Sequence, residues 1–229
     1  METTRYVKVA VIGDGSVGKS SIVESFRADD FIPIYKQTVG FDLFEKSISL
    51  QGIPCNLQIS DIGGQSLHSK SLQDYIGSAS AFLLVYDVTN AESFRNLDDW
   101  LHVTRKYSNA KAVYLVGNKV DMGVAMRQVD VNQHEKFIAE NNLSGGIFCS
   151  AKTGDSVVRA FYTLSGNVLG IALTESELQK HDKVLKAFVS AEEDTGRTEW
   201  ADEIEAEDRA LEQKKAQTGQ CGLMACAVS

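Results

Sequence analysis

The chain of 229 residues is poor in proline and cysteine, and it lacks any apolar run of the roughly 18 residues that a membrane-crossing helix needs. The segment from Met1 to Lys8 also lacks the basic and apolar regions of a secretory signal. Neither the cysteines nor the histidines follow the spacing of a zinc site. We therefore expect a fold held by a hydrophobic core, with Cys55 and Cys149 as buried free thiols.

The charge of the chain is acidic and unevenly distributed. Lys and Arg number 23 against 31 Asp and Glu, a net charge of −8, which argues against nucleic acid as a partner because phosphate binding needs clustered cations. Residues 191–229 hold 10 acidic and 4 basic side chains, a net of −6, so residues 1–190 carry −2. The composition predicts a globular domain over 1–175 and an acidic hypervariable tail over 176–229. A solvated tail is favoured over a second domain because residues 192–220 show no apolar face.

Apolar runs alternate with helix-like stretches along the domain. Strands are expected at residues 6–12, 43–50, 56–59, 81–86, 112–116 and 146–149. Helices are expected at residues 19–27, 91–107, 131–140 and 155–169, with Asn90 as an N-cap and a further helix over 174–188. The hairpin signal from Gln51 to Pro54 makes one strand antiparallel. The alternation predicts an α/β fold in three layers: a mostly parallel six-stranded sheet with one antiparallel strand and helices on both faces.

A glycine-rich loop follows the first expected strand and opens the first expected helix. Residues 13–20 read G-D-G-S-V-G-K-S, which matches the phosphate-binding pattern G-x-x-x-x-G-K-[ST] of P-loop NTPases in its proper context. Backbone N–H groups of such a loop and the helix N-terminus bind phosphate oxygens. Lys19 supplies a positive charge for the β- and γ-phosphates, and Ser20 can bind Mg²⁺. The residues predicted to contact the phosphates are Gly15, Ser16, Val17, Gly18, Lys19, Ser20 and Ser21.

Two later motifs predict recognition of guanine. In N-K-x-D, Asp121 carries an acceptor-only carboxylate, which pairs with the two donors on one edge of guanine and would stay unpaired with adenine. The stem of Lys119 can cover the purine ring, and Asn118 can link this loop to the phosphate loop. Ser150, Ala151 and Lys152 follow the last strand, where the Ala151 N–H can reach guanine O6. ATP-dependent P-loop enzymes are therefore disfavoured.

At this point residues 5–170 resemble the small GTPases of the Ras superfamily, with the motifs in the usual order. The T-x-G sequence at Thr38–Gly40 is similar to switch I of the Rab type, and Asp61–Gln65 is similar to the D-x-x-G-Q of switch II. The combination of Y-K-Q-T-V-G, D-I-G-G-Q, A-K-T-G-D-S-V and a C-terminal C-a-a-X most resembles the Rab twenty-eight branch.

The resemblance implies roles for the matching residues. Thr38 would bind Mg²⁺ and sense the γ-phosphate, and Asp61 would hold Mg²⁺ through water. The Gly64 N–H would contact the γ-phosphate, Gln65 would orient the attacking water, and Phe31 would lie against the base. The catalytic set is then Gln65, Thr38 and Lys19, the metal set is Ser20, Thr38 and Asp61, and Gly15 leaves space beside Gln65.

Several positions depart from the Rab pattern. Ser60 stands where most Rabs have Trp, Ile62-Gly63 replaces Thr-Ala, and Ser66 replaces Glu. In the phosphate loop, Gly15-Ser16 replaces the common Ser-Gly. Adjacent glycines make switch II more permissive, so Gln65 is expected to be held loosely. The alternative to a switch is therefore a nucleotide-stabilised adaptor with little GTP turnover. A metabolic P-loop kinase would need an acceptor-substrate site, for which the sequence has no candidate.

The last four residues, Cys226 to Ser229, form a C-a-a-X box with Ser at the final position, which predicts farnesylation of Cys226. One prenyl group gives reversible membrane binding, which a cluster of basic residues would strengthen. The tail has only Lys214-Lys215 as adjacent basic residues. Cys221 is a candidate for acylation as a second signal. We expect a protein that cycles between the cytosol and the cytoplasmic face of membranes with a prenyl-binding carrier.

The resemblance also implies partners and a rate. The chain would be a monomer that binds GTP and GDP with Mg²⁺ and regulates endosomal or ciliary vesicle traffic through effectors, exchange factors and activating proteins. We find no arginine in the sequence at a position from which it would stabilise the transition-state charge of its own active site, the role called an arginine finger. Intrinsic hydrolysis is therefore expected to be slow, on the order of 10⁻⁴ per second, until an activating protein supplies one.

Overall fold

The computed structural model describes residues 4–27, 38, 40–68 and 72–179. The chain divides into two units, residues 1–186 and 187–229, and everything described here lies in the first. Phe31, Cys221, Cys226 and the predicted tail beyond residue 179 lie outside the described residues. The predicted boundary at residue 175 stays a prediction. Of the helix expected over 174–188, residues 175–179 are described and are helical.

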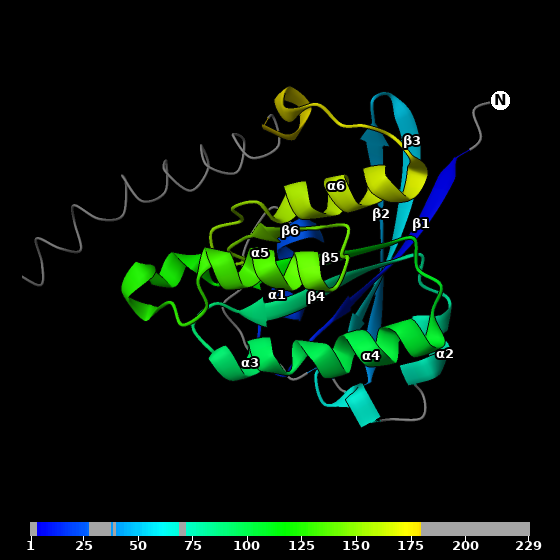
Figure 1. Ribbon diagram of the computed structural model, residues 1–229. Coiled ribbons are helices and arrows are strands. Elements are labelled where there is room, and N and C mark those ends of the chain that lie inside the picture. The colour runs from blue at the N-terminus through cyan, green and yellow to red at the C-terminus, as the bar shows by residue number, and fades with distance from the viewer. Residues whose placement is uncertain (1–3, 28–37, 39, 69–71, 180–229) are drawn as a thin grey trace, which may run out of the picture. The chain divides into compact units, whose positions relative to one another are not determined.

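Strands and helices alternate in the order expected of an α/β domain (Figure 1). The strands are β1 (Arg5–Ile12), β2 (Phe41–Leu50), β3 (Ile53–Ile62), β4 (Ala81–Asp87), β5 (Ala112–Asn118) and β6 (Gly145–Phe148). The α-helices are α1 (Lys19–Arg27), α2 (Leu72–Gly77), α3 (Ala91–Arg95), α4 (Leu97–Tyr107), α5 (Val131–Glu140) and α6 (Val157–Leu169). Short 3₁₀ helices cover Ser66–His68, Val120–Met122 and Val124–Met126.

The strands form one six-stranded sheet in the order β2-β3-β1-β4-β5-β6. Only β2 is antiparallel, paired to β3 through the hairpin turn at Gln51 and Gly52, which both have positive φ. The predicted fold class is therefore confirmed. The five parallel strands end at one edge of the sheet, where Val11 of β1 pairs with Asp61 and Asp87 of β4 pairs with Asn118. Such an edge is where α/β proteins bind their ligands.

Two hydrophobic clusters cover the two faces of the sheet. On one face, α1 and α6 pack through residues such as Phe26 and Phe161, whose rings stack 4.1 Å apart. On the other face, α2, α4 and α5 cover β4 and β5, with Trp100 fully buried. Strand β4 is buried along its whole length, as its continuous apolar run predicts. Cys55 and Cys149 are buried free thiols, also as predicted.

The structure differs from the predicted elements at some boundaries. The single helix expected over 91–107 is two helices that meet at Asn96, whose side chain turns toward the phosphate loop. The predicted cap at Asn90 is present, since its side chain accepts from the Glu92 and Ser93 N–H groups. Helix α6 starts at Val157 rather than 155, because Ser156 before it has a left-handed conformation. Among the described residues, no helix has the length and apolar character to cross a membrane.

His134 on α5 gives the fold a pH dependence. Its side chain is 3% exposed, with Nδ1 2.9 Å from the Tyr86 hydroxyl and its ring against Phe148. Burial, assisted by the nearby Arg127 charge, lowers the His134 pKa from 6.5 to about 4. Between pH 6.5 and about pH 4, the His134 imidazole is protonated in the unfolded chain but stays neutral in the folded chain. The contribution of neutral His134 to stability is therefore complete above the unfolded pKa and is lost as the pH falls from 6.5 toward 4.

We expect His134→Gln to lose less stability than the wild type on acidification from about pH 7 to about pH 5, because the glutamine does not titrate. Urea unfolding of both proteins at each pH measures the difference in slope, and carboxylates common to both cancel in the comparison. Parallel stability curves for the two proteins would contradict this account of His134.

Candidate nucleotide and metal site

The phosphate loop connects β1 to α1 and is held in shape by backbone geometry. Gly18 has φ +94°, and a Cβ there would overlap the Asn118 amide nitrogen. Ser16 has φ +63°, also in the left-handed region. Both positive φ values turn the chain tightly enough for successive N–H groups to face one ligand, which is the geometry that phosphate loops share. Ser21 lies half-buried in the first turn of α1.

Lys19 is a buried cation at the start of α1. Its side chain is 6% exposed and its ammonium donates to the Asp14 main-chain carbonyl at 2.6 Å. Burial lowers the Lys19 pKa to about 8, against the opposing effect of the Asp61 and Asp14 charges. Anionic oxygens placed beside this ammonium would stabilise its charged form. Lys19 is therefore suited to bind phosphate.

Three oxygen-bearing side chains from distant parts of the sequence meet next to Lys19. Ser20 Oγ lies 2.8 Å from Thr38 Oγ1 and donates to Asp61 Oδ2 at 2.5 Å. Thr38 Oγ1 is 3.4 Å from the same carboxylate oxygen. The sequence predicts these residues as the metal set, and the structure brings them together.

The chemistry of this cluster fits Mg²⁺. Asp61 is 1% exposed, and its Oδ1 has no hydrogen-bond partner among the described residues. Burial raises the Asp61 pKa, while the Ser20 hydrogen bond and the Lys19 charge oppose the rise. Mg²⁺ prefers hard oxygen ligands and completes its shell with water and phosphate. Among the described residues, no group of three or more His, Cys, Asp or Glu side chains could hold a metal ion, so a metal here would depend on hydroxyl, water and phosphate oxygens beside Asp61.

The segment after β3 touches both the phosphate loop and the segment around Thr38. A Cβ at Gly64 would overlap the Asp14–Gly15 backbone, and a Cβ at Gly63 would crowd the Thr38 carbonyl. The Gly63 N–H also donates to the Gly40 carbonyl at 2.9 Å. These adjacent glycines thus allow close backbone contact rather than simply a freer chain. Gln65, the next residue, is exposed.

The base-reading loops are linked to the phosphate loop by Asn118. Its side chain is 1% exposed, Nδ2 donates to the Val17 carbonyl at 2.8 Å, and Oδ1 accepts from the Ala151 N–H at 3.0 Å. The sequence assigns this Ala151 N–H to guanine O6, whereas in the structure it donates to Asn118. One amide therefore connects three loops that follow three different strands.

Hydrogen bonds also orient the two charged residues of the N-K-x-D motif. The buried Ser150 hydroxyl donates to Asp121 Oδ1 at 2.7 Å and leaves Asp121 exposed at the surface of the site. Lys119, with φ +70°, donates to the Ser16 carbonyl at 2.9 Å and forms an ion pair with Asp87 at 2.7 Å. Lys152 is exposed beside them.

Sequence reasoning missed Asp87. It ends the apolar strand β4, is 6% exposed, and also accepts hydrogen bonds from the Thr89 N–H and hydroxyl. The sequence did contain an indication of its role: Asp87 is a single carboxylate at the end of a fully buried strand, at the edge of the sheet where α/β proteins bind ligands. Its ion pair holds the Lys119 stem across the loop.

Comparison with known proteins agrees with this geometry. The family model described as Ras family matches residues 8–170. The chain belongs to the Ras family. Within it, the chain is similar to Ras-related protein Rab-28 of Caenorhabditis elegans, at 35% identity over 190 residues that cover 81% of this chain and 76% of that protein.

Two further relatives are also Rab proteins. Ras-related protein Rab-18-B of Danio rerio is 36% identical over 178 residues, covering 76% of this chain and 85% of its own. Ras-related protein Rab-12 of Homo sapiens is 37% identical over 166 residues, covering 71% of this chain and 67% of its own. The protein is therefore a Rab-type small GTPase that resembles Rab-28, and its reaction is GTP hydrolysis.

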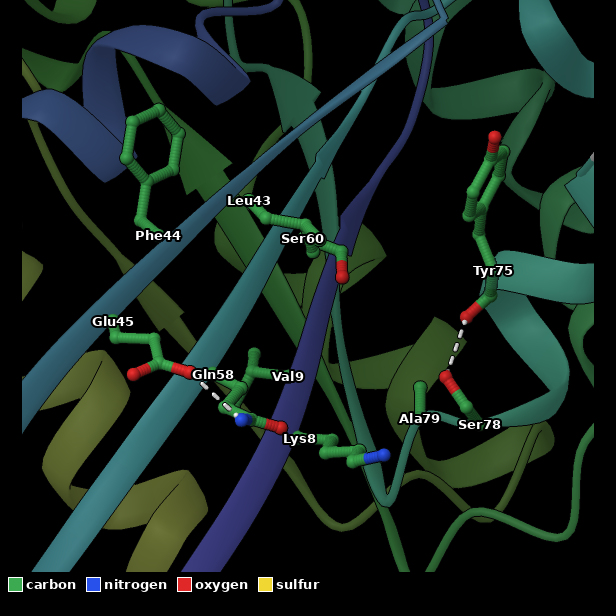
Figure 2. A pocket seen from close by; sticks show the side chains of 10 residues that line it. All are labelled: Lys8, Val9, Leu43, Phe44, Glu45, Gln58, Ser60, Tyr75, Ser78 and Ala79. Carbon is green, nitrogen blue, oxygen red and sulfur yellow. Dashed lines mark hydrogen bonds between the residues drawn. The ribbon is translucent and has the colours of Figure 1, made fainter.

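This Rab-type GTPase has a surface cavity lined mainly by residues of the sheet (Figure 2). The cavity is about 190 Å³ and lies where β1, β2 and β3 meet the region around α2. Ser60, which replaces the usual Rab tryptophan, lines it with Leu43, whose side chain is 65% exposed. The full lining is Lys8, Val9, Leu43, Phe44, Glu45, Gln58, Ser60, Tyr75, Ser78 and Ala79. At its edge the Tyr75 ring packs on Phe41, with centroids 3.7 Å apart.

Two alanine substitutions in the phosphate loop should separate binding from hydrolysis. Gly18→Ala should weaken GDP binding by at least about 100-fold, because left-handed strain and the overlap with Asn118 together cost several kcal/mol. Gly15→Ala should leave binding near the wild type, since no described atom lies within 4 Å of the added Cβ. It should slow hydrolysis, because in the GTP-bound state the added methyl group would occupy space that Gln65 and the attacking water are expected to use.

Equilibrium titration with a fluorescent GDP analogue and single-turnover hydrolysis measure the two effects. Gly77→Ala is the control, because its Cβ would meet the Tyr107 carbonyl at an ordinary 3.5 Å. Equal GDP affinities for Gly18→Ala and Gly15→Ala would contradict the geometry assigned to the loop.

Proposed function

We propose that this GTPase is a switch of endosomal or ciliary vesicle traffic whose two conformations are set by the γ-phosphate at Thr38 and Gly64. The observation that carries the proposal is the Ser20–Thr38–Asp61 cluster, in which the phosphate loop and both switch segments meet through side-chain oxygens 2.5 to 3.4 Å apart. A ligand that engages these groups orders both segments at once.

The residues of the chain position the reaction and stabilise its charge, with no covalent intermediate. Ser20, Thr38 and Asp61 would hold Mg²⁺, which supplies positive charge against the phosphate oxygens when bound. The Lys19 ammonium neutralises the β- and γ-phosphates, and the Gly64 N–H donates to the γ-phosphate. Gln65 orients the attacking water from its exposed position.

Loss of the γ-phosphate releases Thr38 and Gly64 together. Their segments are joined by the hydrogen bond from the Gly63 N–H to the Gly40 carbonyl, so one segment does not move independently of the other. Phe41 follows Gly40 directly, and its ring packs on Tyr75. Tyr75 and Ser60 both line the cavity described above. Effectors that bind there would sense which nucleotide is bound.

Guanine selectivity rests on Asp121. The Ser150 hydroxyl donates to Asp121 Oδ1 and so fixes the orientation of the carboxylate. The exposed carboxylate oxygens still have lone pairs with which to accept the two N–H donors of guanine. The Lys119 stem, held by Asp87, lies across the base. Adenine offers no matching donor pair, so it would leave the carboxylate unpaired.

The proposed cellular cycle adds a lipid and regulators. A prenyl group on Cys226 anchors the GTPase reversibly to the cytoplasmic face of its membrane, and a prenyl-binding carrier returns it to the cytosol. Exchange factors load GTP. Activating proteins raise an intrinsic turnover that is on the order of 10⁻⁴ per second.

The exposed Gln65 favours a second candidate function, a nucleotide-stabilised adaptor with little turnover. The two functions predict different results for Gln65→Leu. For a switch, single-turnover GTP hydrolysis should fall about 10-fold or more while GDP affinity stays unchanged, because Gln65 acts on the water and not on the bound product.

Gln73→Leu on α2 is the matched control, because Gln73 is also exposed and lies outside the site. Hydrolysis is followed by chromatography of the nucleotide after rapid mixing with Mg²⁺. Equal hydrolysis rates for the wild type and Gln65→Leu would exclude the switch mechanism and favour the adaptor.

A second test addresses the lipid anchor. Expressed in animal cells, the wild type should carry the mass of one farnesyl group and distribute between membranes and cytosol, whereas Cys226→Ser should be unmodified and cytosolic. Cys221→Ser is the control and should keep the prenyl group. Membrane-bound Cys226→Ser with an unchanged prenyl mass would contradict the assignment of Cys226.

A further inference from the structure

Asp14, a variable position of the phosphate-loop pattern, makes side-chain contacts with a distant part of the chain. Its Oδ2 accepts from Asn96 Nδ2 at 2.7 Å and its Oδ1 accepts from Trp100 Nε1 at 2.8 Å. Both donors come from the junction of α3 and α4, more than 80 residues away in sequence. Each carboxylate oxygen therefore has its own donor.

The donors are themselves held firmly. Trp100 is fully buried in the cluster under α4. Asn96 lies at the break between α3 and α4, where its own N–H bonds to the Glu92 carbonyl. Hydrogen bonds from neutral donors to a charged acceptor are about twice as strong as neutral pairs. The two bonds thus connect the phosphate loop to the interior of the domain.

The backbone of Asp14 lies where it can transmit this restraint to the site. Its carbonyl accepts from the Lys19 ammonium at 2.6 Å. The peptide that joins it to Gly15 lies against Gly64, where no side chain would fit. Fixing the Asp14 side chain therefore fixes a peptide that contacts both the phosphate-binding cation and the γ-phosphate sensor.

We propose that Asp14 is a positioning residue for nucleotide binding, acting as a clamp made with Asn96 and Trp100 that holds the phosphate loop, Lys19 and Gly64 in the binding geometry. The proposal rests on the proposed function, because it assumes that the loop binds guanine nucleotide phosphates.

The rate of release of a fluorescent GDP analogue in excess Mg²⁺ tests the clamp. Trp100→Phe keeps a buried ring but removes the Nε1 donor, and release should rise about 5-fold. Asp14→Ala removes both acceptors, and release should rise about 30-fold or more, since each hydrogen bond to a charged group contributes on the order of tenfold to an equilibrium. Asp99→Asn, which changes an exposed carboxylate on α4, is the control and should match the wild type.

A rescue variant separates positioning from general stability. Asp14→Asn combined with Asn96→Asp exchanges the two polar groups, keeps an amide donor beside a carboxylate acceptor, and should return release to within about 3-fold of the wild type. All rates are measured below each variant's thermal unfolding midpoint. If Asp14→Ala does not fold, Trp100→Phe carries the test with its ring packing retained.

Release at the wild-type rate in the folded variants would overturn the clamp, even if their unfolding midpoints fell. Acceleration that the exchanged pair fails to rescue would also overturn it. These results differ from a failure of the proposed function, in which the wild type itself would bind no GDP and the clamp would have nothing to position.

Discussion

The nucleotide site depends on two opposite charges that are kept out of water, those of Lys19 and Asp61. Their side chains are 6% and 1% exposed at the carboxyl edge of the sheet. A buried charge is costly unless counter-charges and hydrogen bonds replace the water that it loses. Burial lowers the pKa of Lys19 and raises that of Asp61, so the chain alone compensates neither charge fully. In the proposed site, phosphates and a divalent cation would supply what is missing, and the ligand would then be part of the charge balance of the domain.

The surroundings of these charges divide into a fixed part and a part that can move. Asn118 links the phosphate loop to the last base-reading loop, and the Asp87–Lys119 ion pair adds a second connection. By contrast, Thr38 contacts Ser20 and Asp61 through its hydroxyl, and the Gly63 N–H donates to the Gly40 carbonyl. Binding therefore uses a scaffold built on the strands. In the proposed switch, the γ-phosphate would hold these two segments in place through Thr38 and Gly64.

Sequence patterns predicted the sheet and the flanking helices except α2, because periodicity acts locally, whereas the metal set of Ser20, Thr38 and Asp61 followed from the phosphate-loop motif and the family resemblance. They did not predict the break at Asn96 or the roles of Asp87 and Asp14, since each depends on a partner that only the fold brings near. The adjacent glycines after Ile62 show the same limit: composition suggests freedom, whereas the structure shows backbone contact with Thr38, Gly40 and the phosphate loop. The predicted lipidation of Cys226 and the base contact of Phe31 remain predictions.

The most direct test of this account is to purify the protein, denature it and identify the released nucleotide by chromatography. We expect about one guanine nucleotide per chain, mostly GDP, because in the proposed site the buried charges bind phosphate and Asp121 selects guanine. Adenine nucleotide, or a folded protein that stays empty after titration with GDP and Mg²⁺, would contradict the assignment of the site.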